Sequence, residues 1–474
     1  MNAGTKGSGV PKEKLVAALE EICGADRVST DNRLRDTYGR DKITEEHYAG
    51  RAGVIAWPTT TAEVVQIVQC ARERGVAVTP RGGGSGLSGG AVPVEGGIVI
   101  AMERMNRVLE VDDENLVAVV EPGVVTKELD RVLEPYGLFF AGYPMSEEVC
   151  ELGGNVAENA GGGRAVKYGV TGDYVLGLEV VTGAGEVLEL GGKRIKDVTG
   201  YDLLSLFVGS EGTLGIITRI TLRLLPRPKA RAAVLGFLPD ESALRELTPT
   251  LLRRLSARPS SIEMADATCM RVLKAASSAW KWIPDGACML LVEFDGADAA
   301  GLAASISEAA SLLETYGAVH LQRSHTEDEF RRLWTIRKQV PWALMRMSPH
   351  QTLEDVTVPV SAAWPLIERT RELTRETGIE IANFGHLGDG NIHCTPIKPE
   401  AEDVEQWHRR VPELLELLYR AVIDLGGTIS GEHGIGHKRR RYMPLVFSEA
   451  ELAAQRGLKQ LFDPDGIMNP GKIL

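Results

Sequence analysis

Apolar residues recur at helical spacing near the start of the chain and then give way to alternating strand and helix patterns. Residues 12–23 predict a leading helix, and a polar arm follows to about residue 50. From Val54 the pattern predicts a short strand, a helix over 61–74 and a strand over 76–79. These elements predict an α/β unit behind the arm.

Short strands separated by turn glycines dominate the next part of the chain. The pattern of apolar and polar residues changes after Pro226-Arg227-Pro228, where longer strands begin to alternate with long helices. We therefore place a domain boundary there. Strands are predicted over 97–101, 116–121, 176–181, 186–190, 213–224, 232–237 and 288–294, and helices over 297–316, 412–425 and 449–461.

Length and charge limit the possible functions. A chain of 474 residues with 43% hydrophobic content exceeds one usual core, so two or three domains are expected. The formal charge of -12 argues against nucleic acid as a partner, and the basic run at 438–441 is interpreted as a solvated face. Without a signal-peptide core or an apolar run of 18 residues, a cytoplasmic protein is expected that reaches the inner face of a membrane only through a partner.

The six cysteines are widely scattered and form no C-x-x-C pair. The sequence therefore predicts neither a disulfide framework nor an iron–sulfur cluster. If this chain carries out redox chemistry, its electrons must leave through another molecule.

A glycine-rich loop occupies residues 80–90, Pro-Arg-Gly-Gly-Gly-Ser-Gly-Leu-Ser-Gly-Gly, and contains G-x-G-x-x-G spacing. A Rossmann fingerprint must open a helix, whereas Pro93 and a strand pattern follow here, so that fold is not expected. Successive glycine N–H groups can instead converge on an anion, with the hydroxyls of Ser85 and Ser88 as further donors. A flexible surface loop is the alternative.

Two further glycine-rich segments, 153–163 and 209–215, suggest one extended ligand. In order and spacing the three segments resemble the FAD domain of the vanillyl-alcohol oxidase and p-cresol methylhydroxylase flavoproteins. The resemblance implies an α+β protein, with a two-subdomain FAD-binding domain and an α+β substrate (cap) domain built on an antiparallel sheet. The expected limits are an N-terminal helix and arm over 1–50, the FAD-binding domain over 51–226, the substrate domain over 227–425, and a segment over 426–474 that returns to the FAD domain.

The same resemblance implies which residues bind FAD. Members with covalent FAD commonly carry a histidine in the first loop, where this chain has Ser85, so non-covalent FAD is expected. The implied FAD-binding residues are Pro80, Arg81, Gly82, Gly83, Gly84, Ser85, Gly86, Ser88, Gly89, Gly90, Pro144, Gly153, Asn155, Asn159, Gly162, Gly212, Ile217 and Asn469.

The segment 383–395 predicts a β-hairpin, because Asp389-Gly390 stands between two alternating stretches. A two-residue loop would place His386 directly opposite His393, with Cβ atoms about 4.5–5.5 Å apart. Two such imidazoles can converge on a divalent cation, and the best third ligand lies in Ser430-Gly431-Glu432-His433. The alternative is that the histidines merely pair across the hairpin and that Glu432 and His433 lie in a solvated loop.

This part of the chain resembles a narrower group: cytochrome-type D-lactate dehydrogenase, the flavin subunit of glycolate oxidase and D-2-hydroxyglutarate dehydrogenase. The resemblance implies that His386, His393 and Glu432 bind the metal and that His433 is the base. It also implies that Arg337 holds the substrate carboxylate. A surface position on a helix is the alternative for Arg337.

These residue types suit the oxidation of a hydroxy acid. A dication stabilises the alkoxide, an imidazole accepts the hydroxyl proton, and an arginine orients the carboxylate. Two imidazoles and a carboxylate accept zinc, manganese or iron. The sequence thus predicts an FAD-dependent dehydrogenase acting on a small D-2-hydroxy acid.

The substrate and the acceptor are less closely defined. D-2-hydroxyglutarate dehydrogenases tend to carry a lysine just before the aspartate of a Tyr-Lys-Tyr-Asp-like segment, where this chain reads Leu353-Glu354-Asp355, so D-lactate or glycolate is favoured. The external electron acceptor is expected to be an iron–sulfur subunit, an electron-transfer flavoprotein, a cytochrome or a quinone. Alternatives are D-2-hydroxyglutarate dehydrogenase, an ether-lipid alkyl-dihydroxyacetone-phosphate synthase, and a flavin electron-transfer or scaffold subunit without its own substrate.

Overall fold

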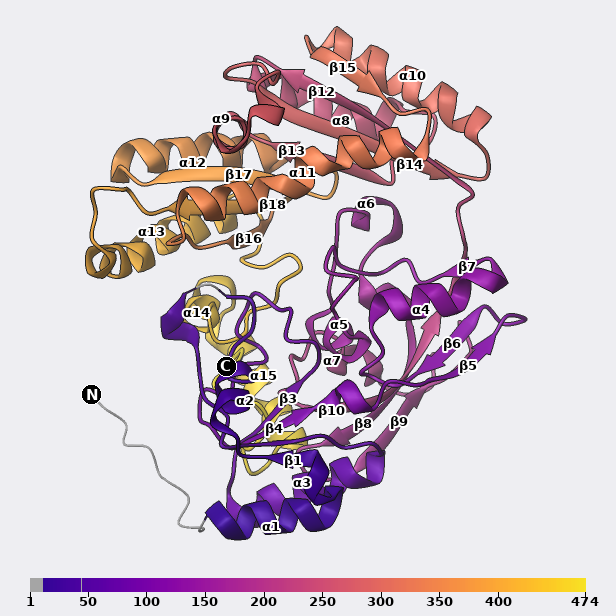
Figure 1. The fold of residues 1–474 in the computed structure, drawn as a ribbon, viewed down its shortest axis with the longest axis vertical. Helices are drawn as coiled ribbons and strands as arrows, with labels where there is room; N and C mark the ends of the chain where they lie inside the picture. Colours follow the sequence, from indigo (N-terminus) through magenta and orange to yellow (C-terminus); the bar gives the residue numbers. More distant parts are fainter. Residues whose placement is uncertain (1–11, 44) are drawn as a thin grey trace. The chain divides into compact units, whose positions relative to one another are not determined.

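The computed structural model describes residues 12–43 and 45–474. Residues 1–11, which enter the expectation that no signal peptide is present, lie outside this range. The described chain forms two compact units, one from 12–160, 170–226 and 432–474, and the other from 161–169 and 227–431. Figure 1 follows the chain through both units by colour.

The first unit contains a small parallel sheet and a larger antiparallel one. The small sheet has the order β1-β2-β4-β3, in which β2, β4 and β3 run parallel. The larger sheet has the order β5-β6-β10-β8-β9 and is antiparallel throughout. The strands are β1 Val28–Ser29, β2 Val54–Ala56, β3 Val78–Arg81, β4 Ile98–Ala101, β5 Val108–Asp112, β6 Val117–Val120, β8 Val175–Thr182, β9 Val187–Gly191 and β10 Gly215–Arg223, with the pair β7 Leu138–Phe139 and β11 Leu225–Pro226 beside them.

Helices cover these sheets at positions that the sequence marks clearly. The helix over 61–74 is confirmed: Thr60 accepts a hydrogen bond from the Glu63 N–H at its start, and Gly75 ends it in the left-handed conformation. The helices are α1 Lys12–Cys23, α2 Asn32–Thr37, α3 Thr61–Arg74, α4 Thr126–Leu133, α5 Leu152–Glu158, α7 Leu204–Phe207, α14 Met443–Val446 and α15 Glu449–Phe462.

The end of the chain completes this unit. Met468 bridges Val78 of β3 in parallel, and the Asn469 N–H donates to the Val78 carbonyl at 2.7 Å. Ile467 and Met468 also belong to the apolar cluster formed by α1, α3 and the small sheet.

The second unit is built on one seven-stranded antiparallel sheet with the order β15-β12-β14-β13-β17-β18-β16. The antiparallel sheet expected for the substrate domain is therefore confirmed. The strands are β12 Ala230–Leu238, β13 Ser261–Ala265, β14 Cys288–Gly296, β15 Val319–Arg323, β16 Glu354–Thr357, β17 Glu380–His386 and β18 Asn391–Ile397.

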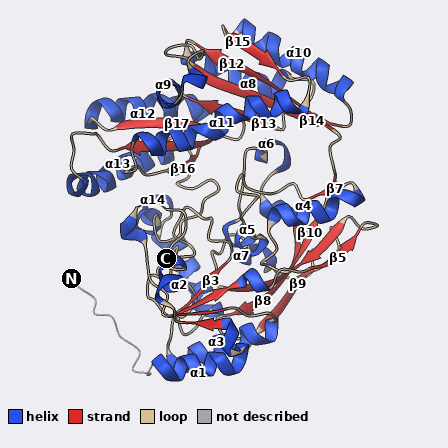
Figure 2. Cartoon of the chain, in the orientation of Figure 1, coloured by secondary structure: helices blue, strands red, loops and turns tan. Residues whose placement is uncertain are grey.

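Helices pack on both faces of this sheet, as Figure 2 shows. The main cluster of apolar side chains in the unit lies between the sheet and the pair α9 and α11, and includes Phe237, Leu291 and Trp334. The helices of the unit are α6 Ala165–Tyr168, α8 Leu244–Arg254, α9 Ala267–Ala276, α10 Ala299–Thr315, α11 Glu327–Met347, α12 Ala363–Thr377 and α13 Val404–Asp424.

Two features of this unit differ from expectation. Helix α13 begins at Val404, N-capped by Asp403, and contains Pro412 inside rather than at its start, because the apolar stripe already begins at Trp407. Residues 161–169 lie in the segment expected to bind FAD but group with the second unit. Ion pairs from Arg164 to Glu293 and from Lys167 to Asp295 hold them there.

Candidate functional site

The first glycine loop joins β3 to β4, which are parallel neighbours, and contains no helix. The expectation that it is not a Rossmann loop is therefore confirmed. Within the described residues, the backbone N–H groups of Gly82, Gly83, Gly84, Ser85 and Gly86 donate no hydrogen bond. A run of uncommitted N–H donors is the arrangement that binds a pyrophosphate.

The three glycine segments meet at one cleft in the first unit. Glycine is required there for close packing: Gly212 has φ +67, and a Cβ on it would lie 2.5 Å from Pro80 Cγ. The walls of the cleft are formed by Pro80, Arg81, Gly82, Gly90, Ala91, Met102, Pro122, Gly153, Gly154, Ala157, Glu158, Glu211, Gly212, Gly215, Ile216 and Ile217. Glycine walls let the backbone N–H groups approach a ligand closely, as the pyrophosphate of FAD would require.

Other residues expected to bind FAD have structural contacts instead. The Asn155 side chain donates to Thr126 Oγ1 at 2.8 Å, and Asn159 accepts from the Gly172 N–H at 2.8 Å. Asn469 donates to the carbonyls of Gly90 at 2.9 Å and Glu211 at 2.7 Å, so it joins the first and third glycine segments from behind. The FAD contacts of all the residues expected to make them stay predictions: Pro80, Arg81, Gly82, Gly83, Gly84, Ser85, Gly86, Ser88, Gly89, Gly90, Pro144, Gly153, Asn155, Asn159, Gly162, Gly212, Ile217 and Asn469.

Two glutamates stand in the wall of this cleft. Glu211 accepts from the N–H groups of Ile435 at 2.7 Å and Gly436 at 2.6 Å, whereas Glu158 Oε2 is buried without a hydrogen-bond partner among the described residues. Burial, the Glu211 carboxyl and Asp41 raise the pKa of Glu158 well above its ordinary value, against the charge of Arg439. Burial likewise raises the pKa of Glu211, although the two backbone hydrogen bonds oppose the rise.

The hairpin of the second unit has a different register from the one expected. His386 pairs with Asn391, and His393 pairs with Phe384, so the loop spans four residues, 387–390, and the two-residue loop is wrong. Leu387 is buried, and the Gly388 N–H donates to Ile262 of β13, which removes both residues from the ladder. The slip is two residues, so both imidazoles stay on one face of the sheet, with ring centroids 5.3 Å apart.

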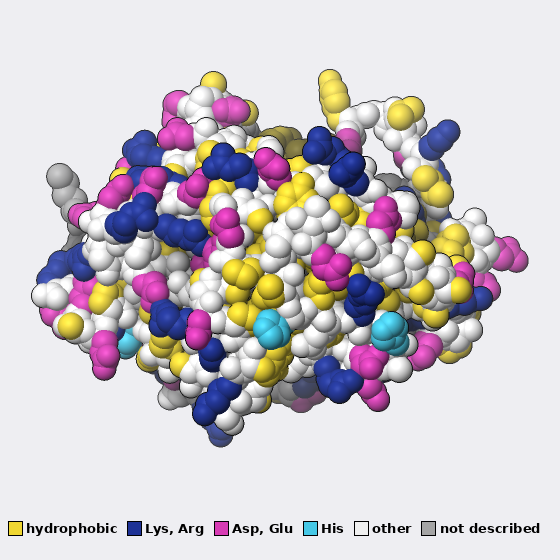
Figure 3. Space-filling view, turned by 90° about the horizontal axis from the view of Figure 1, so that it is seen from above, with side chains coloured by type: hydrophobic (Ala, Val, Ile, Leu, Met, Phe, Trp, Pro, Cys, Tyr) yellow, Lys and Arg dark blue, Asp and Glu magenta, His cyan; other side chains and the backbone are white. Residues whose placement is uncertain are grey.

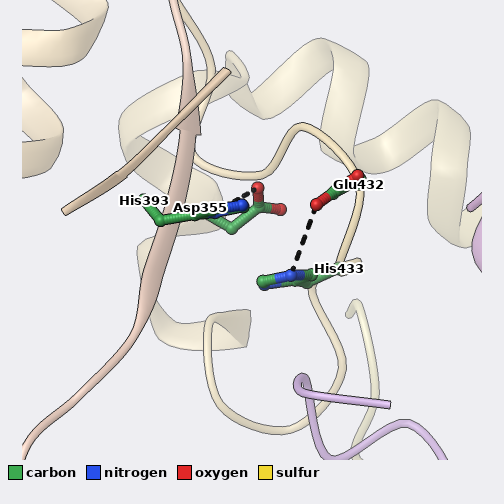
Figure 4. Close-up of side chains that lie close together, drawn as sticks. All are labelled: Asp355, His393, Glu432 and His433. Atoms are coloured by element: carbon green, nitrogen blue, oxygen red, sulfur yellow. Dashed lines mark ion pairs between the residues drawn. The ribbon is translucent and has the colours of Figure 1, made fainter. Parts of the chain in front are cut away.

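Four side chains could hold a metal ion: Asp355, His393, Glu432 and His433, whose ligand atoms all lie within 4.8 Å of one another. Figure 4 shows them converging, with ion pairs of 3.7 Å between His393 Nδ1 and Asp355 Oδ1 and between His433 Nε2 and Glu432 Oε1. Asp355 is fully buried directly across the strand from His393. Two imidazoles and two carboxylates suit zinc, manganese or iron.

Asp355 also positions the segment that carries Glu432. Its Oδ2 accepts from the Ser430 hydroxyl at 2.9 Å and the Gly431 N–H at 3.0 Å, and its Oδ1 accepts from Asn391 at 2.7 Å. Gly431 is required there, because a Cβ would lie 2.1 Å from Thr357 Oγ1. Asp355 on β16, next to β18, therefore fixes the backbone immediately before Glu432 and His433.

His386 lies outside this group of four. Its Nδ1 is 2.6 Å from Glu263 Oε1, directly across strands β17 and β13. The other oxygen of Glu263 accepts from Arg337 Nε at 2.7 Å. Arg337 is therefore a buried residue of α11 and not one on an exposed helix face, and its guanidinium lies over the Phe384 ring at 4.9 Å.

Sequence reasoning missed Asp355 as a possible ligand and Glu263 altogether. Each stands in a short buried strand, 354–357 or 261–265, where a carboxylate is costly unless it is paired. For Glu263, an acidic residue between apolar neighbours was the available signal, whereas Asp355 follows Glu354 in a strand without an apolar pattern. Such a position indicates that the carboxylate is paired with another polar group, but that group can be identified only when the strand order is known.

Comparison with known proteins identifies the family. The family described as FAD linked oxidases, C-terminal domain, matches residues 227–473, and the one described as FAD binding domain matches 52–191. The chain belongs to the FAD-linked oxidases. It is an FAD-linked oxidoreductase of the 2-hydroxy acid dehydrogenase group.

Relatives align over most of this FAD-linked oxidase. Glycolate oxidase subunit GlcD of Bacillus subtilis (strain 168) is 36% identical, covering 98% of this chain and 96% of that protein. D-lactate dehydrogenase of Archaeoglobus fulgidus is 37% identical, covering 89% and 91%. The solved structure of p-cresol methylhydroxylase with substrate bound has a TM-score of 0.77 at 17% identity, covering 98% of each chain, and confirms the expected fold.

The surface of this FAD-linked oxidase carries both charges side by side. On the face drawn in Figure 3, the Lys and Arg side chains are interspersed with Asp and Glu side chains. Among the described helices, none is both long and apolar enough to cross a bilayer.

The cleft gives a test of FAD binding. Gly154 lies in α5 on the cleft wall, and a Cβ there meets nothing within 4 Å. Gly154→Leu should therefore fold but fill the cleft, and we expect the FAD content per chain, measured by flavin absorbance, to fall at least about tenfold. Gly457→Leu is the matched control, because Gly457 is also a helical glycine facing open space, but it lies away from the cleft. Equal FAD content in the two variants would contradict the assignment of the cleft.

The glutamates of the cleft predict a pH dependence of stability. A raised pKa means that stability from Glu158 is fully present below the ordinary value of 4.5 and is lost as the pH rises through the folded-state value. Glu158→Gln should raise the melting temperature of the FAD-loaded protein by about 2–4 °C at about pH 8 and leave it unchanged at about pH 4. The exposed Glu148→Gln should have no effect at either pH. A Glu158→Gln protein that is less stable at the higher pH would exclude this repulsion.

Proposed function

We propose that this protein is an FAD-dependent dehydrogenase that oxidises a small D-2-hydroxy acid, D-lactate or glycolate, to the 2-oxo acid with a divalent metal at the site. The observation that carries the proposal is the convergence of His393, Glu432 and His433 with the buried Asp355. Imidazole nitrogens and carboxylate oxygens that converge in this way are ligands that zinc, manganese and iron accept.

In this proposal His386, His393 and Glu432 bind the metal, which would stabilise the alkoxide of the bound substrate. A metal-binding histidine usually gives its second ring nitrogen to a carboxylate. The 2.6 Å contact between His386 and Glu263 has this form and supports His386 as a ligand. His393 Nδ1 lies 3.7 Å from Asp355 Oδ1, beyond hydrogen-bond distance, and is assigned to the metal by its place in the converging group. Asp355 already accepts three hydrogen bonds, so we assign it to positioning His393 and the 430–431 turn.

His433 is proposed as the base that accepts the proton of the substrate hydroxyl. Arg337 is proposed to hold the substrate carboxylate, since Glu263 takes its Nε–H and leaves the two terminal nitrogens for a bidentate contact. FAD, when bound, supplies the hydride acceptor at flavin N5. We propose that it is held non-covalently, because Ser85 stands in the first loop in place of a histidine.

The site favours a small acid over a dicarboxylate. Leu353, at the position where a lysine would meet a second carboxylate, packs against the apolar cluster of α9 and α11. An apolar packed residue cannot pair with a charged group. D-2-hydroxyglutarate is therefore the second candidate. Relatives named for glycolate and D-lactate are 36% and 37% identical, against 31% for the relative named for D-2-hydroxyglutarate, and this also favours the smaller acids.

Electrons are proposed to leave to a separate acceptor. The relatives from Bacillus subtilis and Escherichia coli are named as subunits of glycolate oxidase. In this chain all six cysteines are buried and scattered along the sequence. An iron–sulfur subunit, an electron-transfer flavoprotein, a cytochrome or a quinone fits this requirement. Rapid direct reaction of the reduced flavin with oxygen would argue for an oxidase instead.

Anaerobic mixing with 2-hydroxy acids tests the function. We expect D-lactate or glycolate to bleach the flavin absorbance, L-lactate to fail, and D-2-hydroxyglutarate to act weakly. Dialysis against EDTA should abolish bleaching, and zinc, manganese or iron(II) should restore it. A flavin that stays oxidised with every acid, with metal analysis showing a loaded site, would refute the dehydrogenase proposal.

Two histidine variants separate the ligand from the base. His393→Ala should lose both the bound metal and flavin reduction, whereas His433→Ala should keep the metal and slow flavin reduction by about 10²–10⁴-fold. Metal is measured by mass spectrometry and reduction by stopped flow. His325→Ala, an exposed histidine outside the site, is the control. Loss of metal from His433→Ala would make that residue a ligand and leave the base unassigned.

A further inference from the structure

Glu263 is a fully buried carboxylate that faces two of the residues proposed above. It lies on β13 directly opposite His386 on β17, and its Oε1 is 2.6 Å from His386 Nδ1. Its Oε2 is 2.7 Å from Nε of Arg337 on α11. The Ser261 hydroxyl donates to Oε1 at 3.0 Å. Each carboxylate oxygen of Glu263 therefore contacts a different residue of the proposed site, Oε1 the imidazole of His386 and Oε2 the guanidinium of Arg337.

The pairing with Arg337 keeps this buried carboxylate matched. Arginine is a permanent cation, and its Nε–H donates a charge-assisted hydrogen bond to Oε2 of Glu263. Removing the carboxylate would leave the buried guanidinium without its counterion.

Each hydrogen bond to Glu263 fixes one orientation. The bond to Arg337 Nε and the Phe384 ring, 4.9 Å from the guanidinium carbon, fix the position of the guanidinium. The contact with His386 Nδ1 fixes the orientation of the imidazole ring, as a carboxylate commonly does for a metal-binding histidine. Phe384 also pairs with His393 across the strands, so one face of the sheet carries all these groups.

The backbone nearby leaves no room for an alternative position of this carboxylate. A Cβ on Gly163 would lie 2.8 Å from Glu263 Oε1 and 3.3 Å from His386 Nδ1. The Gly163 backbone therefore packs directly on the Glu263–His386 contact. A larger residue there would push the two groups apart without changing the charge of either.

We propose that Glu263 is a positioning residue that sets both the arginine for the substrate carboxylate and one metal-binding imidazole, so that substrate and metal affinities depend on the same buried carboxylate. This inference rests on the proposed function, because the roles of Arg337 and His386 come from it. Glu263 itself touches neither substrate nor metal. Its effect is on geometry, and both affinities should change together when it is altered.

A matched control lies in the first unit. Glu179 on β8 is also buried and pairs with an arginine, Arg219, at 3.0 Å. It accepts hydrogen bonds from Thr61 and Thr218 rather than from His386 or Arg337. Glu179→Gln therefore removes a buried, arginine-paired carboxylate without touching the proposed link.

The test measures both affinities in one protein. Zinc affinity is obtained by titrating metal-depleted, FAD-loaded protein with Zn²⁺ against a competing chelator, and substrate affinity from the D-lactate concentration that half-saturates anaerobic flavin reduction. Glu263→Gln should weaken zinc binding about 10–100-fold and raise the half-saturating D-lactate concentration about tenfold. Glu179→Gln should change neither by more than about twofold. If Glu263→Gln fails to fold, Gly163→Ala should shift both affinities in the same direction.

The outcomes separate this inference from the proposed function. If the wild-type protein binds no zinc and no hydroxy acid bleaches its flavin, the proposed function falls, and this inference falls with it. If the wild type does both, and folded Glu263→Gln changes only one affinity or neither, the inference alone is overturned. Equal effects of Glu263→Gln and Glu179→Gln would also overturn it, because they would indicate general loss of stability.

Discussion

A charge can stay inside this protein only where a partner meets it, and the sheet of the second unit is arranged around that constraint. Glu263 is paired with Arg337 and His386, Glu293 with Arg164, and Asp295 with Lys167. Each pairing joins segments far apart in the sequence. A slip of one residue in β13 or β14 would turn their carboxylates to the opposite face of the sheet, away from these partners. The desolvation cost of an unpaired carboxylate therefore favours the observed strand register.

The flavin-binding unit follows a different rule, in which the backbone rather than side-chain charge supplies the recognition. Gly82 to Gly86 leave a run of N–H donors without internal acceptors, and close packing at Gly90 and Gly212 keeps side chains out of the cleft. The two wall glutamates are an exception to this plain backbone surface. Glu211 has a structural purpose, since it ties the 435–436 backbone to the third glycine segment. Glu158 has no equivalent hydrogen bonds through Oε2.

Much of this architecture could be predicted from local patterns. The helix over 61–74 carries its own capping signals, and the strands of both units stand out as apolar runs between turn residues. The glycine loop could be separated from a Rossmann loop because a strand, not a helix, follows it. The hairpin register could not be predicted, since Leu387 and Gly388 are drawn toward β13, a strand more than a hundred residues earlier. For the same reason Glu263 and Asp355 could not be placed beside the histidines: strand order in a seven-stranded sheet is a long-range property.

The first unit is interrupted in sequence by the second, and this has a bearing on the order in which the parts are synthesised. Met468 bridges β3, and Asn469 donates to the carbonyls of Gly90 and Glu211, so residues on the cleft wall are joined by a segment that follows the second unit in the chain. Most of the second unit, 227–431, is one continuous stretch that is translated before that segment. It can therefore fold around its own sheet during translation, before the two flanking parts of the first unit have met.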